Sequence, residues 1–314
     1  MDVNPQIKIL LEQANAAGLP ALHQLTPAEA RAQVEAGARA RANNPIPVAA
    51  VENLEIPTER AKVPMRLYRP RARPPLPMLV YFHGGGHVVG SLDTHDATAR
   101  SLCVNAQCLV ASIDYRLAPE AKFPAAVDDC FAATQWLAQH GERMGADVSK
   151  LAVGGDSAGG NLAAVTALMA RDFGGPDLCF QLLVYPIADY ACSSSTYEKY
   201  GSGFGILEAD TMYWFRDHYL PNIDGAQDWR ASPIHATSLS GLPPALVITA
   251  ECDVLHDDGE QYAAKLAAAD IDVTHHNYAG MIHGFFGMLG LADDAQNAHD
   301  LAAEHLKRAF NTGP

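Results

Sequence analysis

The feature that most constrains this chain is the pentapeptide Gly-Asp-Ser-Ala-Gly at positions 155–159. It follows the apolar run 151–154 and precedes a stretch typical of a helix. A serine between two glycines at such a junction predicts a sharp turn, because a Cβ on either glycine would collide with the neighbouring strand and helix. Ser157 would then sit on a strained elbow with its hydroxyl exposed. The pattern alone is also compatible with an ordinary glycine-rich turn.

A second motif lies upstream, where His83-Gly84-Gly85-Gly86 directly follows the apolar run 78–82. Glycines after a strand let backbone N–H groups approach a substrate oxygen, because no side chains intervene. The two motifs in this order indicate an esterase-type active site.

The chain resembles the hormone-sensitive-lipase-like family of α/β-hydrolases, the microbial carboxylesterases with a His-Gly-Gly-Gly loop. The resemblance runs from about residue 78 to 287 and includes the segments 114–120, 250–255 and 280–285. It departs mildly at Val254, where the family often has proline. It implies an α/β-hydrolase fold, with a mostly parallel eight-stranded sheet, helices on both faces and a helical cap.

Short apolar runs alternate with helical patterns, which by itself predicts a mostly parallel sheet covered on both faces. Helices are expected at 125–140, 160–171 and 259–269. The expected strands are 51–56, 63–69, 78–82, 109–113, 151–154, 181–185, 245–249 and 273–278.

Two segments stand outside this alternation. Apolar residues after Asn4-Pro5 recur at helical spacing, and Thr26-Pro27-Ala28-Glu29 is a capping box that opens a second helix towards residue 42. Residues 190–229 hold nine of the 24 aromatic residues, and most of these rings are expected to pack the segment's own core while a few shape a pocket. The expected division is 1–44 and 189–231 as cap, with 45–188 and 232–314 as the catalytic core.

A serine nucleophile needs a base and an acid that orients the base. In this fold the partners follow in the order serine, acid, histidine. The strand 245–249 is followed by Glu251, Asp253, Asp257 and Asp258, of which the last two are read as helix-start charges. Spacing leaves Glu251 and Asp253 open, and the family resemblance selects Asp253.

Thirteen histidines are present, and six of them follow Asp253: His256, His275, His276, His283, His299 and His305. His299 and His305 lie in a polar terminal helix, where solvated roles are expected. His283 lies in a loop after a strand, where catalytic residues are usually presented. It matches the catalytic histidine of the family.

The resemblance places an oxyanion hole at the N–H of Ala158 with those of Gly85 and Gly86, to which Gly84 is a possible addition. Asp156 and His83 are expected to hold the neighbouring loops by hydrogen bonds. Asp114 and Arg116 are expected to form an internal ion pair.

Charge and composition argue against several other functional classes, namely proteins that bind nucleic acid, membranes, metals or cofactors. With 22 Lys and Arg against 36 Asp and Glu, the formal charge is −14, which disfavours nucleic acid and anionic membranes as partners. There is no zinc-type spacing and no phosphate or dinucleotide motif, so no metal and no cofactor is expected. Six scattered cysteines and the lack of a signal-peptide pattern predict buried free thiols and a cytoplasmic location.

The predicted function is therefore hydrolysis of short- to medium-chain carboxylic esters by a monomer or homodimer. An amidase or peptidase on the same triad is an alternative. A ligand-binding receptor is another, because the plant gibberellin receptors resemble this family; they have lost the catalytic histidine, whereas His283 is present here.

Overall fold

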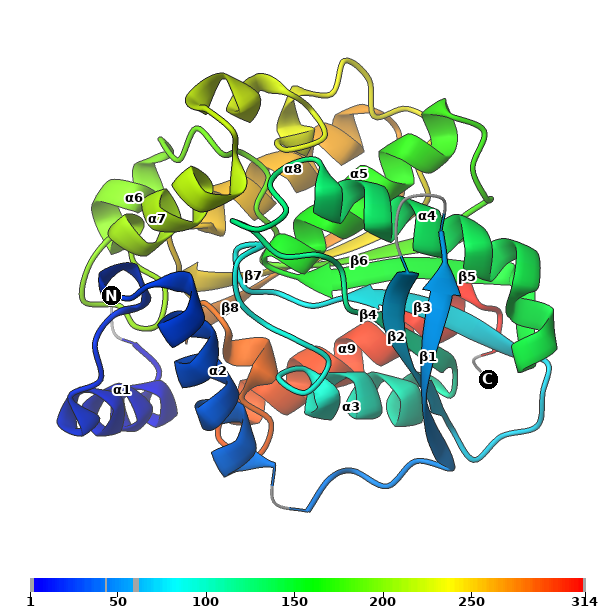
Figure 1. The fold of residues 1–314 in the computed structure, drawn as a ribbon, viewed down its shortest axis with the longest axis horizontal. Helices are drawn as coiled ribbons and strands as arrows, with labels where there is room; N and C mark the ends of the chain where they lie inside the picture. Colours follow the sequence, from blue (N-terminus) through cyan, green and yellow to red (C-terminus); the bar gives the residue numbers. More distant parts are fainter. Residues whose placement is uncertain (1–2, 43, 59–61, 313–314) are drawn as a thin grey trace.

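The fold is described by a computed structural model covering residues 3–42, 44–58 and 62–312 (Figure 1). Within these residues, eight strands form one sheet in the order β1-β2-β4-β3-β5-β6-β7-β8. The strands are β1 (Ala50–Pro57), β2 (Lys62–Arg69), β3 (Leu76–Phe82), β4 (Leu109–Ile113), β5 (Ala146–Asp156), β6 (Phe180–Val184), β7 (Ala245–Cys252) and β8 (Val273–Ile282).

The sheet is mostly parallel, as predicted. β2 pairs antiparallel with β1 and with β4, and all other neighbours pair parallel. All eight predicted strands are confirmed, and several are longer than their apolar runs. β8 in particular continues to Ile282, which places residue 283 directly at the end of a strand.

Helices cover both faces of the sheet, with α3 and α9 on one side and α4, α5 and α8 on the other (Figure 1). Residues 158–170 of α5 are buried without exception, as expected for an apolar helix at the centre of a fold. The helices of the core are α3 (Asp96–Ala106), α4 (Ala125–His140), α5 (Ala158–Asp172), α8 (His256–Ala268) and α9 (Asp293–Ala309), with short 3₁₀ turns η2 (Gly141–Met144), η4 (Pro233–His235) and η5 (Phe285–Gly287).

The remaining helices gather beyond one end of the sheet (Figure 1). α1 begins after Asn4, whose side chain accepts the Gln6 N–H, and α2 begins at the predicted capping box of Thr26 and Glu29. α2 ends at Arg41, close to the expected end near residue 42, and residue 43 lies outside the described residues. These helices are α1 (Pro5–Ala17), η1 (Leu22–Gln24), α2 (Pro27–Arg41), α6 (Ser195–Tyr200), α7 (Ala209–Tyr219) and η3 (Ile223–Gln227).

Several composition-based expectations are tested by the fold. All six cysteines are free thiols, and all but the half-buried Cys179 are buried. Arg116 does not pair with Asp114: it forms its ion pair with Asp129 of α4, at 2.7 Å, because the chain turns its side chain towards that helix.

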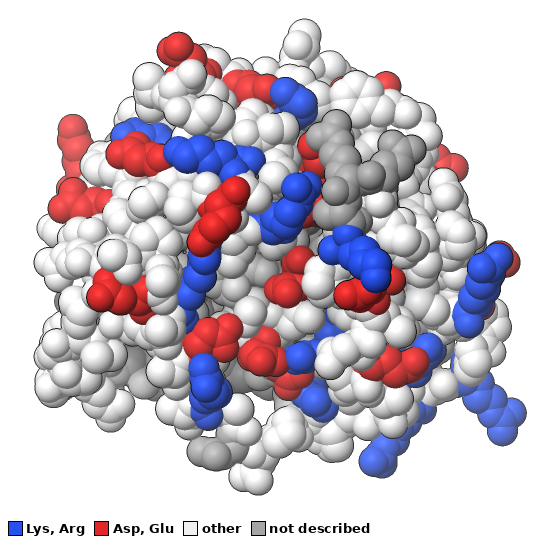
Figure 2. Space-filling view, viewed as in Figure 1, with Lys and Arg blue, Asp and Glu red and all other residues white. Residues whose placement is uncertain are grey.

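Acidic and basic side chains are interspersed over the face shown in Figure 2. Over the described part of the chain, no helix has the length and apolar character needed to cross a membrane. The cytoplasmic location and the oligomeric state stay predictions.

Candidate active site

Ser157 stands on a tight turn between β5 and α5. Its backbone has φ +56° and ψ −118°, an unusual conformation for a residue with a side chain, and its N–H donates to Val184 O of β6 at 2.8 Å. A Cβ on Gly155 or on Gly159 would overlap the carbonyl oxygen of Phe82 in β3. The glycines on both sides of the serine are therefore required by backbone contacts, as predicted.

Three of the predicted site residues form one chain of hydrogen bonds. His283 Nε2 lies 2.9 Å from Ser157 Oγ, and His283 Nδ1 lies 2.7 Å from Asp253 Oδ2. The other carboxylate oxygen of Asp253 accepts the Leu255 N–H at 2.9 Å, and the Asp253 side chain is fully buried. Asp253 follows β7 and His283 follows β8, so the carboxyl ends of neighbouring parallel strands bring them together.

The other candidate acids, of which Glu251 lies within β7, have different partners. Glu251 accepts the Gly280 N–H at 2.8 Å, and Asp257 accepts a serine hydroxyl of α6 at 2.7 Å. Asp258 is more than a helix-start charge: it is buried, accepts two backbone N–H groups after β6, and burial raises its pKa to about 8.

The terminal helix α9 carries a buried histidine. His299 is not solvated, as had been expected, but is fully buried and stacked on Phe286 at 3.8 Å. Its Nε2 lies 3.0 Å from Phe286 O, and burial lowers its pKa to about 4. The apolar face of α9 turns it inward, which the polar composition of this helix does not reveal.

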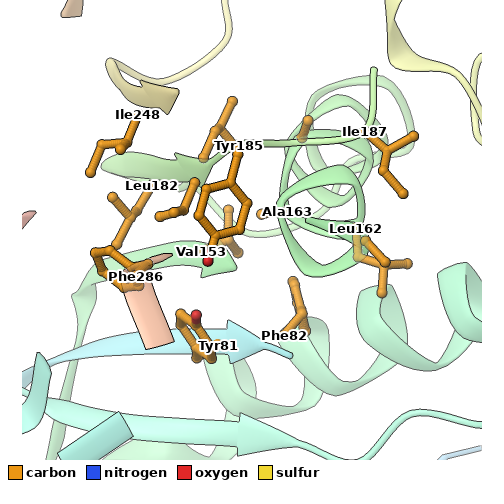
Figure 3. Packing of buried hydrophobic residues seen from close by; sticks show 14 of the residues in the cluster. Tyr81, Phe82, Val153, Leu162, Ala163, Leu182, Tyr185, Ile187, Ile248 and Phe286 are labelled. Atoms are coloured by element: carbon orange, nitrogen blue, oxygen red, sulfur yellow. The ribbon is translucent and has the colours of Figure 1, made fainter. Parts of the chain in front are cut away.

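The ring of Tyr185 backs His283, with ring centroids 4.5 Å apart. Tyr185 has φ +32°, and its N–H donates to Ile248 O at 2.6 Å. Figure 3 shows Tyr185 close to Tyr81 and Phe286, which come from separate segments of the chain. No sequence motif marks this tyrosine: it is the last residue of the expected strand 181–185 and lies just past β6 in the structure.

The glycine loop follows β3 and lies beside the elbow. Gly85 and Gly86 have φ +120° and +57°, and a Cβ on Gly86 would overlap the ring of Phe215 from α7. The Gly84 N–H is already donated to Asp156 Oδ1 at 3.2 Å. Gly84 therefore lines the site with an engaged N–H, which argues against its inclusion among oxyanion donors. Ala158 begins α5, where first-turn N–H groups have no acceptor within the helix.

Asp156 and His83 hold the loop by hydrogen bonds, as predicted. Asp156 also accepts the Tyr81 hydroxyl at 2.6 Å and lies 3.3 Å from His95 Nε2. Burial acts to raise the pKa of Asp156, but the charge of His95 and these hydrogen bonds outweigh it and lower the pKa to about 2. His83 Nδ1 lies 2.8 Å from Gly84 O, and burial lowers the pKa of His83 to about 3, which keeps it neutral.

Ser157 and His283 open into a cavity of about 380 Å³ with mainly apolar walls. Of the nine aromatic residues between 190 and 229, only Phe215 lines it, which is fewer than the few that were expected to shape a pocket. The apolar lining consists of Leu10, Ala14, Leu22, Val34, Val89, Tyr185, Ile206, Leu207, Phe215, Phe286, Met288 and Leu291.

A possible metal-binding group lies at the start of α8, away from the cavity lining. His256, Asp257 and Glu260 are the described residues whose potential ligand atoms come within 4.8 Å of one another. Asp257 is already bonded to a serine of α6, and Glu260 is exposed. Nothing else at this position points to a metal.

Comparison with known proteins identifies the family. The family profile described as alpha/beta hydrolase fold matches residues 79–287. The chain is 44% identical over 255 residues to carboxylesterase NlhH of Mycobacterium tuberculosis, covering 79% of each chain. It is 37% identical over 320 residues to an ethyl acetate hydrolase of Pseudomonas putida, covering 98% of this chain and 99% of the relative.

Solved structures agree over the full length. A mutant of LAE6, an alpha/beta hydrolase enzyme from the metagenome of Lake Arreo in Spain, has a TM-score of 0.95 at 40% identity, with 99% of each chain covered. A thermostable esterase from Pseudomonas putida has a TM-score of 0.94 at 38% identity, with 98% of each chain covered. The chain therefore belongs to the hormone-sensitive-lipase-like carboxylesterases of the α/β-hydrolase fold, and it is a carboxylic ester hydrolase.

Proposed function

We propose that this protein hydrolyses short- to medium-chain carboxylic esters through an acyl-enzyme formed on Ser157. The observation that carries the proposal is the hydrogen-bonded series Ser157, His283 and Asp253 at the wall of an apolar cavity. In this arrangement an imidazole is within hydrogen-bond reach of a serine hydroxyl and is itself oriented by a buried carboxylate.

The reaction then has two steps. His283 Nε2 takes the proton of Ser157 Oγ while Oγ attacks the ester carbonyl, and the same nitrogen returns that proton to the leaving alcohol. Water, activated by His283, hydrolyses the resulting acyl-enzyme. Asp253 holds the imidazole in the tautomer with its hydrogen on Nδ1 and stabilises the imidazolium that forms.

The negative charge on the carbonyl oxygen needs fixed N–H donors. We assign this role to Gly85, Gly86 and Ala158, and we leave out Gly84 because its N–H is donated to Asp156. One donor of this kind is typically worth roughly 3–4 kcal/mol of transition-state stabilisation.

Two features support a preference for esters with small acyl groups. The cavity is about 380 Å³ and is walled by aliphatic and aromatic side chains, which suits a compact apolar group. The relative from Pseudomonas putida that aligns over 98% of this chain is named for the hydrolysis of ethyl acetate.

The cavity walls also support a two-part cap. Leu10, Leu22 and Val34 come from the first 44 residues, and Leu207 and Phe215 come from the insertion. His23 Nδ1 lies 3.0 Å from Thr211 Oγ1, which joins the two parts. We therefore assign 1–44 and 189–231 to the cap, and 45–188 and 232–314 to the catalytic core.

A fluorophosphonate ester tests the nucleophile, because it reacts only with an activated serine. We expect one label per chain, at Ser157. Ser157→Ala should abolish labelling and lower kcat on p-nitrophenyl butyrate by a factor on the order of 10⁴–10⁶. His283→Ala should do nearly the same, since the members of a triad act as a unit.

Ser112→Ala is the matched control, because Ser112 is also buried and its hydroxyl has no partner among the described residues. This variant should keep full activity and labelling. A label elsewhere, or none on folded protein, would leave the receptor alternative standing. Faster turnover of a p-nitroanilide than of the matching p-nitrophenyl ester would favour the amidase alternative instead.

A further inference from the structure

A second histidine lines the cavity and has no part in the series of Ser157, His283 and Asp253. We propose that His95 is a positioning residue for ester hydrolysis: it holds the Asp156 carboxylate beneath the glycine loop and thereby sets where the loop's N–H donors stand. The inference rests on the proposed function, because it concerns the same oxyanion site.

His95 is held at both ring nitrogens. It directly precedes α3, its side chain is 18% exposed, and it lies in the cavity wall. Its Nε2 lies 3.3 Å from Asp156 Oδ2, and its Nδ1 lies 2.8 Å from Thr94 Oγ1. The Gly84 nitrogen also lies 3.3 Å from Nε2. Because an ionised carboxylate only accepts hydrogen bonds, we assign the hydrogen to Nε2, which donates it to Asp156.

Asp156 in turn supports the first residue of the glycine loop. Its Oδ1 accepts the Gly84 N–H at 3.2 Å, and its Oδ2 lies 2.5 Å from the position that a Cβ on Gly84 would take. The carboxylate therefore fills the space beneath Gly84. Since Gly84 is followed directly by Gly85 and Gly86, a shift of the carboxylate moves both proposed donors.

Three donors share the two oxygens of this carboxylate. The Tyr81 hydroxyl and the Gly84 N–H both reach Oδ1, whereas Oδ2 is reached by His95. Tyr81 comes from β3 and is fully buried, so it holds the carboxylate from the sheet side. Without His95, Oδ2 would lose this donor and the carboxylate could turn towards Tyr81.

The hydrogen bond from His95 also compensates a buried anion next to the nucleophile. Asp156 is the residue directly before Ser157, and its pKa is lowered partly by the charge of His95. A buried carboxylate that loses its partner is strongly unfavourable and moves or takes up water. Either response would disturb the position of the glycine loop more than the hydrogen bonds that join Ser157, His283 and Asp253.

The test compares His95→Ala with His95→Gln, because the Gln Nε2 amide can donate to the same carboxylate oxygen. We expect His95→Ala to lower kcat on p-nitrophenyl butyrate by about 10- to 100-fold, less than the loss of an oxyanion donor, with KM changed less than about twofold. His95→Gln should recover most of the rate. His140→Ala, on the surface-facing side of α4 and stacked on Trp136, is the control and should change neither value.

A second measurement distinguishes a displaced glycine loop from a loss of folded protein. A trifluoromethyl ketone adds to the serine and places an oxyanion in the hole, so its affinity should fall by the same factor as kcat in His95→Ala. The end point of fluorophosphonate labelling should stay at one per chain. If His95→Ala does not fold, His95→Gln and Thr94→Val are measured instead. Thr94→Val removes the Nδ1 contact together with the bonds of this hydroxyl to the Ser91 N–H and O, and it should show a smaller loss of the same kind.

An unchanged kcat in His95→Ala, or a loss of kcat without any loss of ketone affinity, would overturn the inference. A lowered labelling end point that matches the loss of kcat would also overturn it, because it indicates fewer folded sites. If Ser157→Ala kept its activity, the proposed function itself would fail, which is a different outcome from these.

Discussion

The serine elbow with its glycine loop and the cap are held in place by different kinds of contact. At the elbow the constraints come from backbone atoms: glycines 155 and 159 face the Phe82 carbonyl, and Gly85 faces the carbonyl of Val89. The cap is attached by backbone hydrogen bonds, from Asn4 N–H to Gly280 O and from Phe123 N–H to Tyr219 O, and also through side chains. Arg31 of α2 donates to Val88 O at 2.8 Å and to Ala118 O at 2.7 Å, and it also pairs with Glu120.

This difference in contacts indicates which of the two regions tolerates amino-acid substitutions. Backbone atoms of a central sheet cannot move without breaking strand pairing, so the elbow admits almost no alternative residue. Side-chain contacts can be replaced one at a time, and each is worth only a few kcal/mol at most. The cap can therefore alter the cavity wall while the position of the reacting groups stays constant.

Among the substitutions that test this difference between elbow and cap, Gly159→Ala should have the largest effect on stability. Its Cβ would overlap the Phe82 carbonyl in the middle of the sheet. Because that oxygen cannot give way, we expect a loss of at least about 3 kcal/mol in the free energy of unfolding, at the upper end for overpacking, with loss of esterase activity. Urea unfolding followed by circular dichroism measures the first quantity.

Gly37→Ala in α2 is the matched substitution in the cap. Gly37 is helical, and its Cβ would meet only the flexible end of Arg41, at 3.4 Å. The same replacement should therefore stabilise the protein by roughly 0.5–1 kcal/mol, the helix propensity difference between alanine and glycine. Equal effects of the two variants would show that the two regions do not differ in tolerance.

Arg31→Met should produce an intermediate effect. It keeps much of the side chain's length but removes the four hydrogen bonds that Arg31 of α2 donates to the core. We expect a loss of about 2 kcal/mol in stability and a changed preference between acetate and hexanoate esters, because α2 carries part of the cavity wall. The ratio of kcat/KM for the two esters is the measurement.

Glu120→Gln separates the ion pair from the contacts to carbonyl groups. The Arg31 guanidinium lowers the pKa of Glu120 to about 2, but Glu120 is largely exposed and such pairs are worth little in water. This variant should lose at most about 0.5 kcal/mol and keep its selectivity. A larger loss than in Arg31→Met would contradict the importance of the carbonyl contacts.

The last prediction concerns the stability of the protein in acid, which we expect to depend on buried histidines of the core. Burial lowers the pKa of His83 and of His87 to about 3 and that of His299 to about 4, against about 6.5 for an unfolded chain. Below about pH 6.5 the unfolded state binds protons that the folded state does not. Stability from these residues is thus fully present above that pH and is lost as the pH falls towards 4.

His299→Leu removes one such group, so its stability should depend less on pH, by about 1 kcal/mol per pH unit between pH 6 and 5. Above pH 7.5 the two proteins should show the same slope, which serves as the internal control. Urea midpoints at a series of pH values check this. Parallel curves down to pH 5 would mean that His299 is protonated in the folded state.

Local sequence was sufficient for much of this structure. Apolar runs and their spacing predicted all eight strands, because the pattern of apolar residues that marks a buried strand extends over only a few neighbouring residues. The capping box at Thr26 and Glu29 predicted a helix start for the same local reason. The glycines around Ser157, taken together with the glycine loop upstream, predicted the elbow, and the structure shows that a Cβ on Gly155 or Gly159 would overlap backbone atoms.

Contacts between distant residues were decided only by the tertiary structure. Glu251 and Asp253 both follow the apolar run 245–249. Only the pairing of β7 with β8 brings Asp253, and not Glu251, to His283. Arg116 is two residues from Asp114 in sequence, yet it pairs with Asp129 of a neighbouring helix. Spacing along the chain does not fix such distances, because they depend on how separate elements pack.

The same limit applies to the surroundings of the glycine loop. A run of glycines predicts that backbone N–H groups are accessible, but the engagement of Gly84 by Asp156 requires the elbow to pack beneath the loop. The cavity wall likewise combines α1, α2 and α7 with the loop after β8. The sequence by itself determined which chemical groups and which backbone turns are present, whereas packing in three dimensions decided which of those groups meet.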